Sequence, residues 1–372
     1  MPVGSNFAAL LGVEHPIIQA PMAGGATTPE LVAAVANAGA LGMIGAAYLT
    51  PTQIADTIAA TRRLTNRPFG VNLFAGGGED TREVDPAPML AFLTRYHDEL
   101  GLPPPTLATS TPVPFADQLD VVLAAGVPIF SFTFGIPDSA AIAALKAHDT
   151  MILGTATTVD EARQLEAAGV DGIVAQGSEA GAHRGTFAAL FEAAMVGTIA
   201  LVPLVVDAVK VPVVASGGIM DGRGIVAAEA LGAAGVQLGT AFLASRESGI
   251  PAVYKAALRA AQAEQTALTR AFSGRPARGI VNDVIRDLHG REDILLPFPL
   301  QNDATRPLRA AAAARGDTRF LSLWAGQGAA LARDVSAADL VTQLVQEARE
   351  IRVRIAAGHP IRALPGNSPT TR

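Results

Sequence analysis

The chain has 372 residues, of which 49% are hydrophobic and 17% are charged, so it can build one large core or one core with a smaller appended unit. Its net charge of −6, without any dense run of Lys and Arg, argues against a nucleic-acid partner. The absence of cysteine excludes disulfides, thiolate metal sites and a cysteine nucleophile. Reactivity must therefore come from histidine, carboxylates or a bound cofactor.

The N-terminal residues carry no basic segment of the kind that begins a secretion signal. The longest apolar run, residues 193–206, has 14 residues and is interrupted by Pro203, which is too short and broken for a membrane-spanning helix. We therefore expect a cytoplasmic protein with no membrane partner.

Short apolar stretches alternate with alanine-rich stretches along most of the chain. The apolar stretches predict strands and the alanine-rich stretches predict helices. The predicted strands are 15–20, 41–45, 69–74, 127–134, 151–154, 173–175, 211–215 and 236–238. The predicted helices are 28–38, 51–64, 139–147, 159–168, 190–196, 223–231 and 251–265.

A similar phrase, with a glycine directly before an apolar stretch, recurs at Gly39, Gly126, Gly169 and Gly235. A glycine at this place predicts a left-handed helix stop before the next strand. Helices that alternate with continuous apolar strands indicate a parallel sheet, and eight such units favour a closed (β/α)₈ TIM barrel over an open sheet.

The alternation ends at about residue 266, where a segment rich in proline, arginine and loop signals begins. We assign residues 1–266 and 328–372 to the barrel, including a final amphipathic helix at 337–355, and residues 267–327 to an inserted lid subdomain. The long proline-rich connection 76–116 is expected to contribute to this lid over the mouth of the barrel.

Two glycine clusters follow the last two predicted strands, with the sequences SGG at 216–218 and QLGT at 237–240. In a TIM barrel these two loops commonly hold a phosphate, which faces backbone N–H groups and a helix N-terminus. One cluster alone is explained by a tight turn, but two at consecutive strand ends favour phosphate binding. The sequence contains neither a dinucleotide fingerprint at the first strand nor a phosphate-binding loop of the nucleotide-hydrolase type.

A charged, glycine-rich segment, QGSEAGAHRG at 176–185, follows the sixth predicted strand. His183 is the one histidine of the six that combines a strand-end position with neighbouring glycines, so we expect it to be catalytic. The alternative is a structural histidine in a loop, with Glu179 and Arg184 as a solvated ion pair. No second histidine or carboxylate stands at metal-ligand spacing, so we expect no metal site.

Polar groups at other strand ends are suited to bind a planar heterocycle. The backbone at Met22 and Ala23 and the amides of Asn72 and Gln176 offer hydrogen bonds to the edge of a ring, with apolar residues against its face. Taken one at a time, these residues are better explained as core methionine and strand-terminal amides.

The chain resembles the nitronate monooxygenases, formerly called 2-nitropropane dioxygenases, in the subgroup with a long C-terminal insertion. The motifs that carry the resemblance are QAPMAG at 19–24, VNLF at 71–74, QGSEAGAHRG at 176–185, ASGGIMDGRG at 215–224, QLGT at 237–240 and WAGQ at 324–327. The resemblance implies an FMN-dependent TIM barrel that oxidises alkyl nitronates, typically propionate 3-nitronate, with O₂ to carbonyl compounds and nitrite or nitrate.

The resemblance also implies where the cofactor contacts and the catalytic histidine fall. His183 takes the catalytic position. The FMN contacts fall on Met22, Ala23, Asn72, Gln176, Gly181, Gly217, Gly218, Gln237, Leu238, Gly239 and Thr240.

The chain departs from the subgroup in one respect. Members of this subgroup usually line the substrate pocket with tyrosines, whereas this chain has only Tyr48, Tyr96 and Tyr254, and neither 103–114 nor 296–301 contains one. A closely similar barrel serves NAD(P)H:quinone reductases and flavin-dependent enoyl-acyl-carrier-protein reductases, which are the alternative functions. A flavin- or phosphate-binding module without catalysis is a third.

Overall fold

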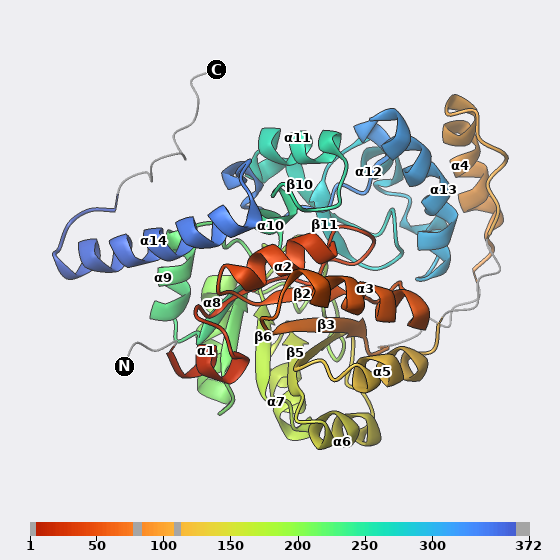
Figure 1. Cartoon of the computed structure of the whole chain (residues 1–372). Helices are drawn as coiled ribbons and strands as arrows, with labels where there is room; N and C mark the ends of the chain where they lie inside the picture. The colour runs from red at the N-terminus through yellow and green to blue at the C-terminus, as the bar shows by residue number, and fades with distance from the viewer. Residues whose placement is uncertain (1–4, 77–83, 108–112, 362–372) are drawn as a thin grey trace.

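Eight parallel strands form the centre of the molecule (Figure 1). The structure is a computed structural model that describes residues 5–76, 84–107 and 113–361. The strands are β1 (Ile17–Gln19), β2 (Gly42–Gly45), β3 (Phe69–Phe74), β4 (Ile129–Thr133), β5 (Met151–Ala156), β6 (Gly172–Gln176), β8 (Val213–Ser216) and β9 (Gly235–Leu238). Their order in the sheet is β1-β9-β8-β6-β5-β4-β3-β2.

Backbone hydrogen bonds between β1 and Leu41, just before β2, close the sheet into a barrel. Leu41 N donates to Ile17 O and Gln19 N donates to Leu41 O, each at 2.9 Å. The predicted (β/α)₈ TIM barrel is therefore confirmed, and each of the eight predicted strands overlaps an observed one.

Helices surround the strands and pack apolar faces against them. They are α2 (Pro29–Asn37), α3 (Pro51–Leu64), α5 (Phe115–Ala124), α6 (Ser139–Ala147), α7 (Val159–Ala168), α8 (Thr198–Ala208) and α9 (Gly222–Ala230), with the short α10 (Thr240–Leu243) directly after β9. Side chains cap several N-termini: the Thr28, Thr50, Asp138, Thr158 and Asp221 side chains each accept from a backbone N–H in the first turn.

Three of the four predicted glycine stops adopt the left-handed conformation. Gly39, Gly126 and Gly169 have φ angles of 84°, 58° and 89°. The prediction is wrong at Gly235, which begins β9, while Gly232, with φ 94°, follows α9. Gly235 is instead required for close packing, since a Cβ there would lie 2.8 Å from Pro16 O.

The predicted helix at 190–196 is also wrong, because this segment forms turns and the helix begins later, at Thr198. Glu161 Oε1 accepts from the N–H groups of Phe187 and Ala188, and the Arg184 guanidinium donates to Ala194 O. These side chains hold the backbone in an irregular path that sequence periodicity does not reveal.

The last barrel helix is separated from β9 by a large insertion. This helix, α14 (Ala337–Ala356), packs against α9 and α2 and so takes the eighth helical position of the barrel (Figure 1). The segment between α10 and α14 contains α11 (Ala252–Ala260), β10 (Thr266–Thr269), β11 (Ala277–Ile280), α12 (Asp283–Leu288), α13 (Leu300–Arg315) and 3-10 turns at Ala263–Gln265, Glu292–Ile294, Thr318–Phe320 and Ala329–Leu331.

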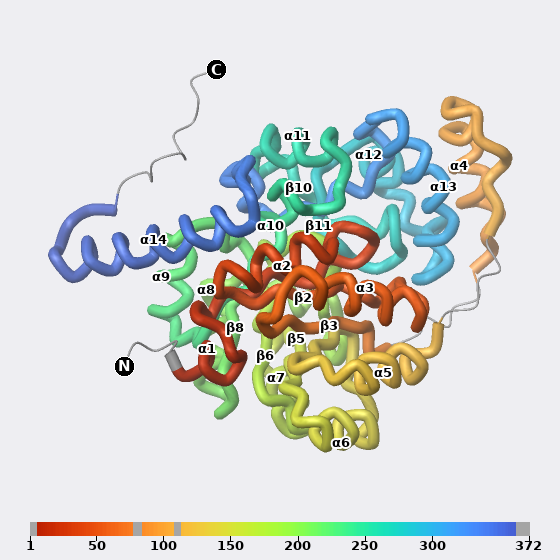
Figure 2. The backbone as a smooth tube through the Cα atoms, viewed as in Figure 1, coloured from red at the N-terminus to blue at the C-terminus, as the bar shows by residue number. Residues whose placement is uncertain are grey.

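The insertion has its own hydrophobic core, which includes Phe272, Leu296 and Phe320 and also draws on α11 and on α4 (Ala87–Glu99). Figure 2 shows α4 beside α13, although the two are far apart in sequence. Among the described residues of 76–116, none lines the cavity described below, so α4 braces the outside of the insertion. The proposed domain limits, including the boundary at residue 266, stay a prediction.

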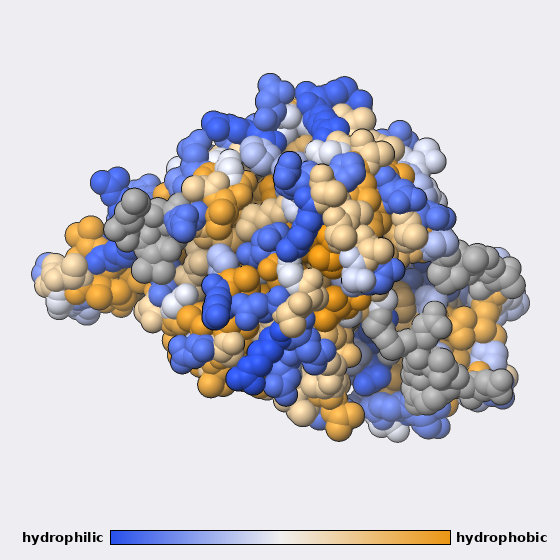
Figure 3. Space-filling model, turned by 90° about the horizontal axis from the view of Figure 1, so that it is seen from below, coloured by the Kyte–Doolittle hydropathy of each residue, from blue (hydrophilic) through white to orange (hydrophobic). Residues whose placement is uncertain are grey.

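The bottom of the barrel is closed by α1 (Ser5–Leu11), whose Phe7 and Leu11 pack against inward-facing residues such as Ile18, Leu153 and Val214. The face seen from below mixes hydrophilic and hydrophobic residues (Figure 3). No helix in the described parts of the chain is long and apolar enough to cross a membrane.

Candidate active site

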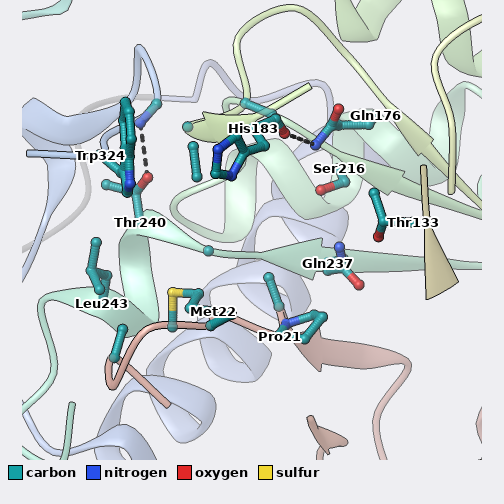
Figure 4. A pocket seen from close by; sticks show the side chains of 18 of the residues that line it. Pro21, Met22, Thr133, Gln176, His183, Ser216, Gln237, Thr240, Leu243 and Trp324 are labelled. Atoms are coloured by element: carbon teal, nitrogen blue, oxygen red, sulfur yellow. Dashed lines mark hydrogen bonds between the residues drawn. The ribbon is translucent and has the colours of Figure 1, made fainter. Parts of the chain in front are cut away.

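A cavity of about 270 Å³ opens at the carboxyl ends of the barrel strands, opposite α1. The barrel loops form one part of its wall and the insertion forms the other. Figure 4 shows His183 and Trp324 on one side of the cavity and Pro21 and Met22 on the opposite side. The space between them is suited to a flat ligand with apolar contacts on its faces.

Polar side chains line the inner end of this cavity because the inward-facing positions change character along the strands. Leu153 and Val214 face the closed bottom of the barrel, and two residues later Thr155 and Ser216 face the cavity. Since alternate residues of a strand share a face, the same register brings seven polar side chains together. They are Asn72, Ser131, Thr133, Thr155, Gln176, Ser216 and Gln237.

The structure brings nearly all of the predicted site residues to this cavity. Those that line it are Met22, Ala23, Asn72, Gln176, Gly181, His183, Gly217, Gly218, Gln237, Gly239 and Thr240. Leu238 does not line it, because its side chain is buried in the barrel core and its carbonyl accepts from Ala20 N at 2.9 Å.

His183 lies on the short strand β7 (Ala182–His183), which pairs with β11 of the insertion. Its Nε2 lies 2.8 Å from Ser273 Oγ. Burial, and then the positive charges of Arg275 and Arg309, lower the pKa of His183 from 6.5 to about 3. The imidazole is therefore neutral at neutral pH, and one of its two ring nitrogens carries no proton.

Arg184 fixes the turn before His183 and is not the solvated residue that the alternative reading expected. It is 2% exposed, and its guanidinium donates to the carbonyls of Gln176 (3.0 Å), Gly177 (2.5 Å) and Ala194 (2.9 Å). Burial lowers the pKa of Arg184 to about 10, so it stays charged. Its five-donor fork holds three segments of backbone together.

The Gln176 amide is largely occupied by the same turn. Its Oε1 accepts from Arg184 Nη1 (3.2 Å) and Gly185 N (2.8 Å), and its Nε2 donates to His183 O (3.1 Å). One N–H of Nε2 is left for a ligand. Gln176 therefore positions the His183 turn as well as lining the cavity.

Glu179 caps a helix and does not pair with Arg184. Its carboxylate accepts from Thr198 N at 2.9 Å and from Thr198 Oγ1 at 2.8 Å, at the start of α8. A carboxylate at this place satisfies N–H groups that have no partner within the helix and is favoured by the helix dipole.

Glycines form the end of the cavity near β8 and β9. Gly217 and Gly218 have φ angles of 119° and 71°, and Gly239 precedes α10. A Cβ on Gly239 would meet nothing closer than the Ala20 Cβ at 3.7 Å, so it would project into open space. The backbone at Gly239 is therefore accessible to a ligand without side chains in the way.

The N-terminus of α9 is closed to ligands, contrary to the expectation that it faces a phosphate. Asp221 Oδ1 accepts from Arg223 N and Glu347 Oε2 accepts from Gly222 N. Glu347 in turn pairs with Arg333 at 2.7 Å. Anion binding at this end therefore depends on the turns at Gly217 and Gly239 and on the start of α10.

Aromatic rings from distant segments surround His183. The ring of Phe134 lies 6.0 Å from the imidazole and that of Trp324 lies 5.6 Å from it. Two of the three tyrosines, Tyr48 and Tyr254, also line the cavity. The pocket therefore contains tyrosines, although they do not come from 103–114 or 296–301.

Sequence reasoning missed the lining residues that the insertion supplies. They include Ser273, Asn302, Arg309, Ser322, Trp324, Gly326 and Gly328. Loop residues of this kind carry no periodic signal. Ser131, Thr133 and Thr155, also missed, do carry one, since each is a polar residue at an inward position of a predicted strand.

Within residues 5–76, 84–107 and 113–361, no group of three or more histidines or carboxylates is arranged to hold a metal ion.

Comparison with known proteins identifies the family. The sequence model of the family described as "Nitronate monooxygenase" matches residues 5–347. The chain belongs to the nitronate monooxygenase family. It is therefore an oxidoreductase.

A relative from Staphylococcus saprophyticus, described as "Probable nitronate monooxygenase", is 43% identical over 356 residues, which are 95% of this chain and 100% of the relative. The crystal structure of nitroalkane oxidase from Streptomyces ansochromogenes is similar with a TM-score of 0.87 and 42% identity, covering 94% of this chain and 99% of the other. FabK from Thermotoga maritima has a TM-score of 0.74 and 31% identity, covering 95% and 98%.

Proposed function

We propose that this protein binds FMN and uses O₂ to oxidise alkyl nitronates, of the propionate 3-nitronate type, to carbonyl compounds and nitrite or nitrate. The observation that carries the proposal is a single cavity that combines an open glycine-lined end, polar side chains at seven strand positions and a neutral histidine. Family membership and the likeness to a nitroalkane oxidase support it.

The residues present fit FMN. The turns at Gly217–Gly218 and Gly239–Thr240 would hold the phosphate through backbone N–H groups, in loops where TIM barrels commonly bind phosphate. Asn72, Gln237 and the remaining N–H of Gln176 would hydrogen-bond the polar edge of the ring, and Met22 and Ala23 would lie against it. The absence of a dinucleotide fingerprint favours a mononucleotide.

When bound, FMN would accept electrons from the substrate and pass them to O₂. The protein side chains would bind, orient and handle protons. His183, neutral and held by Ser273, would accept the proton from the carbon of a neutral nitroalkane. Phe134, Trp324 and Tyr254 would exclude water from the reacting carbon.

A nicotinamide-dependent reductase is the second candidate. It stays a candidate because a closely similar barrel serves flavin-dependent quinone and enoyl-acyl-carrier-protein reductases, and the barrel alone does not decide between the two reactions. The two candidates have the same fold. They differ in the compound that would reduce the flavin, which is a nitronate in the first and a nicotinamide in the second.

An anaerobic titration of the purified, FMN-loaded protein distinguishes the two. We expect propionate 3-nitronate to bleach the visible flavin spectrum rapidly and NADH to leave it unchanged within the same time. Rapid bleaching by NADH, with none by the nitronate, would replace the proposal with the reductase.

A further inference from the structure

Arg309 has an unusual place in the cavity. Among the described residues that line it, Arg309 is the only one with a full charge at neutral pH, and no carboxylate lines it. Arg309 comes from α13, so the insertion supplies this charge. The glycine-lined end for the phosphate, by contrast, has no charged side chain in its lining.

The hydrogen bonds of Arg309 end on neutral groups, although the charge of nearby Asp303 acts on it and opposes the fall in its pKa. Its two hydrogen bonds both leave from Nη2 and end on neutral oxygens of Asn302, O at 2.8 Å and Oδ1 at 2.9 Å. Nε is buried without a partner. The nearby carboxylate of Asp303 pairs with Arg306 at 2.8 Å. Burying a guanidinium that keeps an unsatisfied N–H is costly, and a bound anion would offset that cost.

Arg309 also acts on the residues at the reactive end of the cavity. Burial lowers its own pKa to about 10, so it stays protonated at neutral pH. Its charge lowers the pKa of His183 and opposes the rise in the pKa of Tyr48. The guanidinium therefore lies within electrostatic reach of the imidazole and the phenol.

We propose that Arg309 binds the anionic two-oxygen group of the substrate and so selects anionic substrates over neutral ones. A guanidinium matches a planar pair of oxygens, which both a nitronate and a carboxylate present. The proposal rests on the proposed function in that the anion belongs to a nitronate or its carboxylate chain. The Arg309 fork, held by Asn302, determines specificity, and His183 handles the proton.

Binding of unreactive ligands to the FMN-loaded protein tests this without turnover. Propionate and its neutral isostere propionamide are titrated against the visible flavin spectrum and by calorimetry. We expect Arg309→Met to weaken propionate binding about 10- to 100-fold and to leave propionamide binding unchanged. The matched control is Arg306→Met on the same helix, where the side chain is 62% exposed and does not line the cavity.

Two further variants guard against a folding defect. Arg309→Gln retains a donor toward Asn302 without charge and is expected to behave as Arg309→Met, whereas Arg309→Lys retains the charge and much of the affinity for propionate. Equal weakening of propionate and propionamide in both neutral variants, or unchanged propionate binding, would overturn the proposal.

Kinetic measurements then show which oxygen pair Arg309 binds. A higher KM for ethyl nitronate in Arg309→Met assigns the nitronate group, and a higher KM for propionate 3-nitronate alone assigns the carboxylate. If the wild-type protein oxidises no nitronate but binds propionate through Arg309, the proposed function fails and the anion site stands.

Discussion

Ser273 Oγ lies 2.8 Å from Nε2 of His183, and this contact joins the insertion to the histidine of the barrel loop. Ser273 is 2% exposed, and its Oγ also accepts from Arg275 N at 3.3 Å. The Ser273 hydroxyl has one proton, which it can donate either to Nε2 of His183 or to Arg275 O at 3.2 Å. If it donates to Nε2, the proton of the neutral imidazole is on Nδ1; if it donates to Arg275 O, Nε2 carries the proton and donates to Ser273 Oγ. Ser273 is therefore a positioning residue for His183.

Ser273→Ala should lower kcat for a neutral nitroalkane about 10- to 100-fold, since the imidazole loses its fixed orientation. The KM should change little, and Ser273→Thr, which keeps the hydroxyl, should recover most of the rate. Measuring kcat and KM for a neutral nitroalkane and for its nitronate over a pH range separates this role from a structural one. A uniform loss of folded protein, with unchanged kcat per bound FMN, would contradict it.

Gly239→Ala should reduce the affinity for FMN with little effect on folding. The backbone of Gly239 has φ −100°, which alanine adopts, and a Cβ would meet only Ala20 at 3.7 Å. The new methyl group would instead occupy space next to the proposed phosphate site. Flavin content and the thermal midpoint of the apoprotein are measured together.

Gly218 is the less informative position for that experiment. Its φ of 71° makes any side chain strained, so a Gly218 variant loses stability whether or not a phosphate binds there. Stoichiometric flavin in purified Gly239→Ala, with unchanged affinity, would argue against the phosphate assignment.

Arg184→Met should destabilise the protein by about 3 kcal/mol, because three buried carbonyl contacts lose their donor. The exposed Arg163, paired with Asp160 at 3.5 Å, provides the control, and Arg163→Met should stay within about 0.5 kcal/mol. Chemical denaturation of both variants gives the comparison. Equal stability of the two variants would mean that Arg184 does not support the turn.

The barrel was predictable because its strands are continuous apolar runs, and His183 because it follows one of them beside glycines. Ser131 and Thr155 could also have been predicted as cavity residues, since each is a polar residue at an inward-facing position of its strand. Arg309 could not be predicted as a cavity residue, because its position depends on how α13 packs over the ends of barrel strands that are distant in sequence. Likewise, the helix expected at 190–196 does not form, because Arg184 binds Ala194 O within it and Glu161 binds the backbone of Phe187 and Ala188 just before it.

His183→Asn tests whether the imidazole is a base. Neutral nitroalkanes must lose a proton before oxidation, whereas nitronates have already lost it, so the variant should slow nitroethane about 10²- to 10⁴-fold and ethyl nitronate far less. Because the pKa of His183 is lowered from 6.5 to about 3, the imidazole stays neutral as the pH falls through 6.5. The nitroethane rate of the wild-type protein should therefore show no loss from His183 in that range. Steady-state rates of the FMN-loaded variant with both substrates decide the matter: equal slowing would assign His183 to charge stabilisation, and unchanged rates would remove it from the reaction.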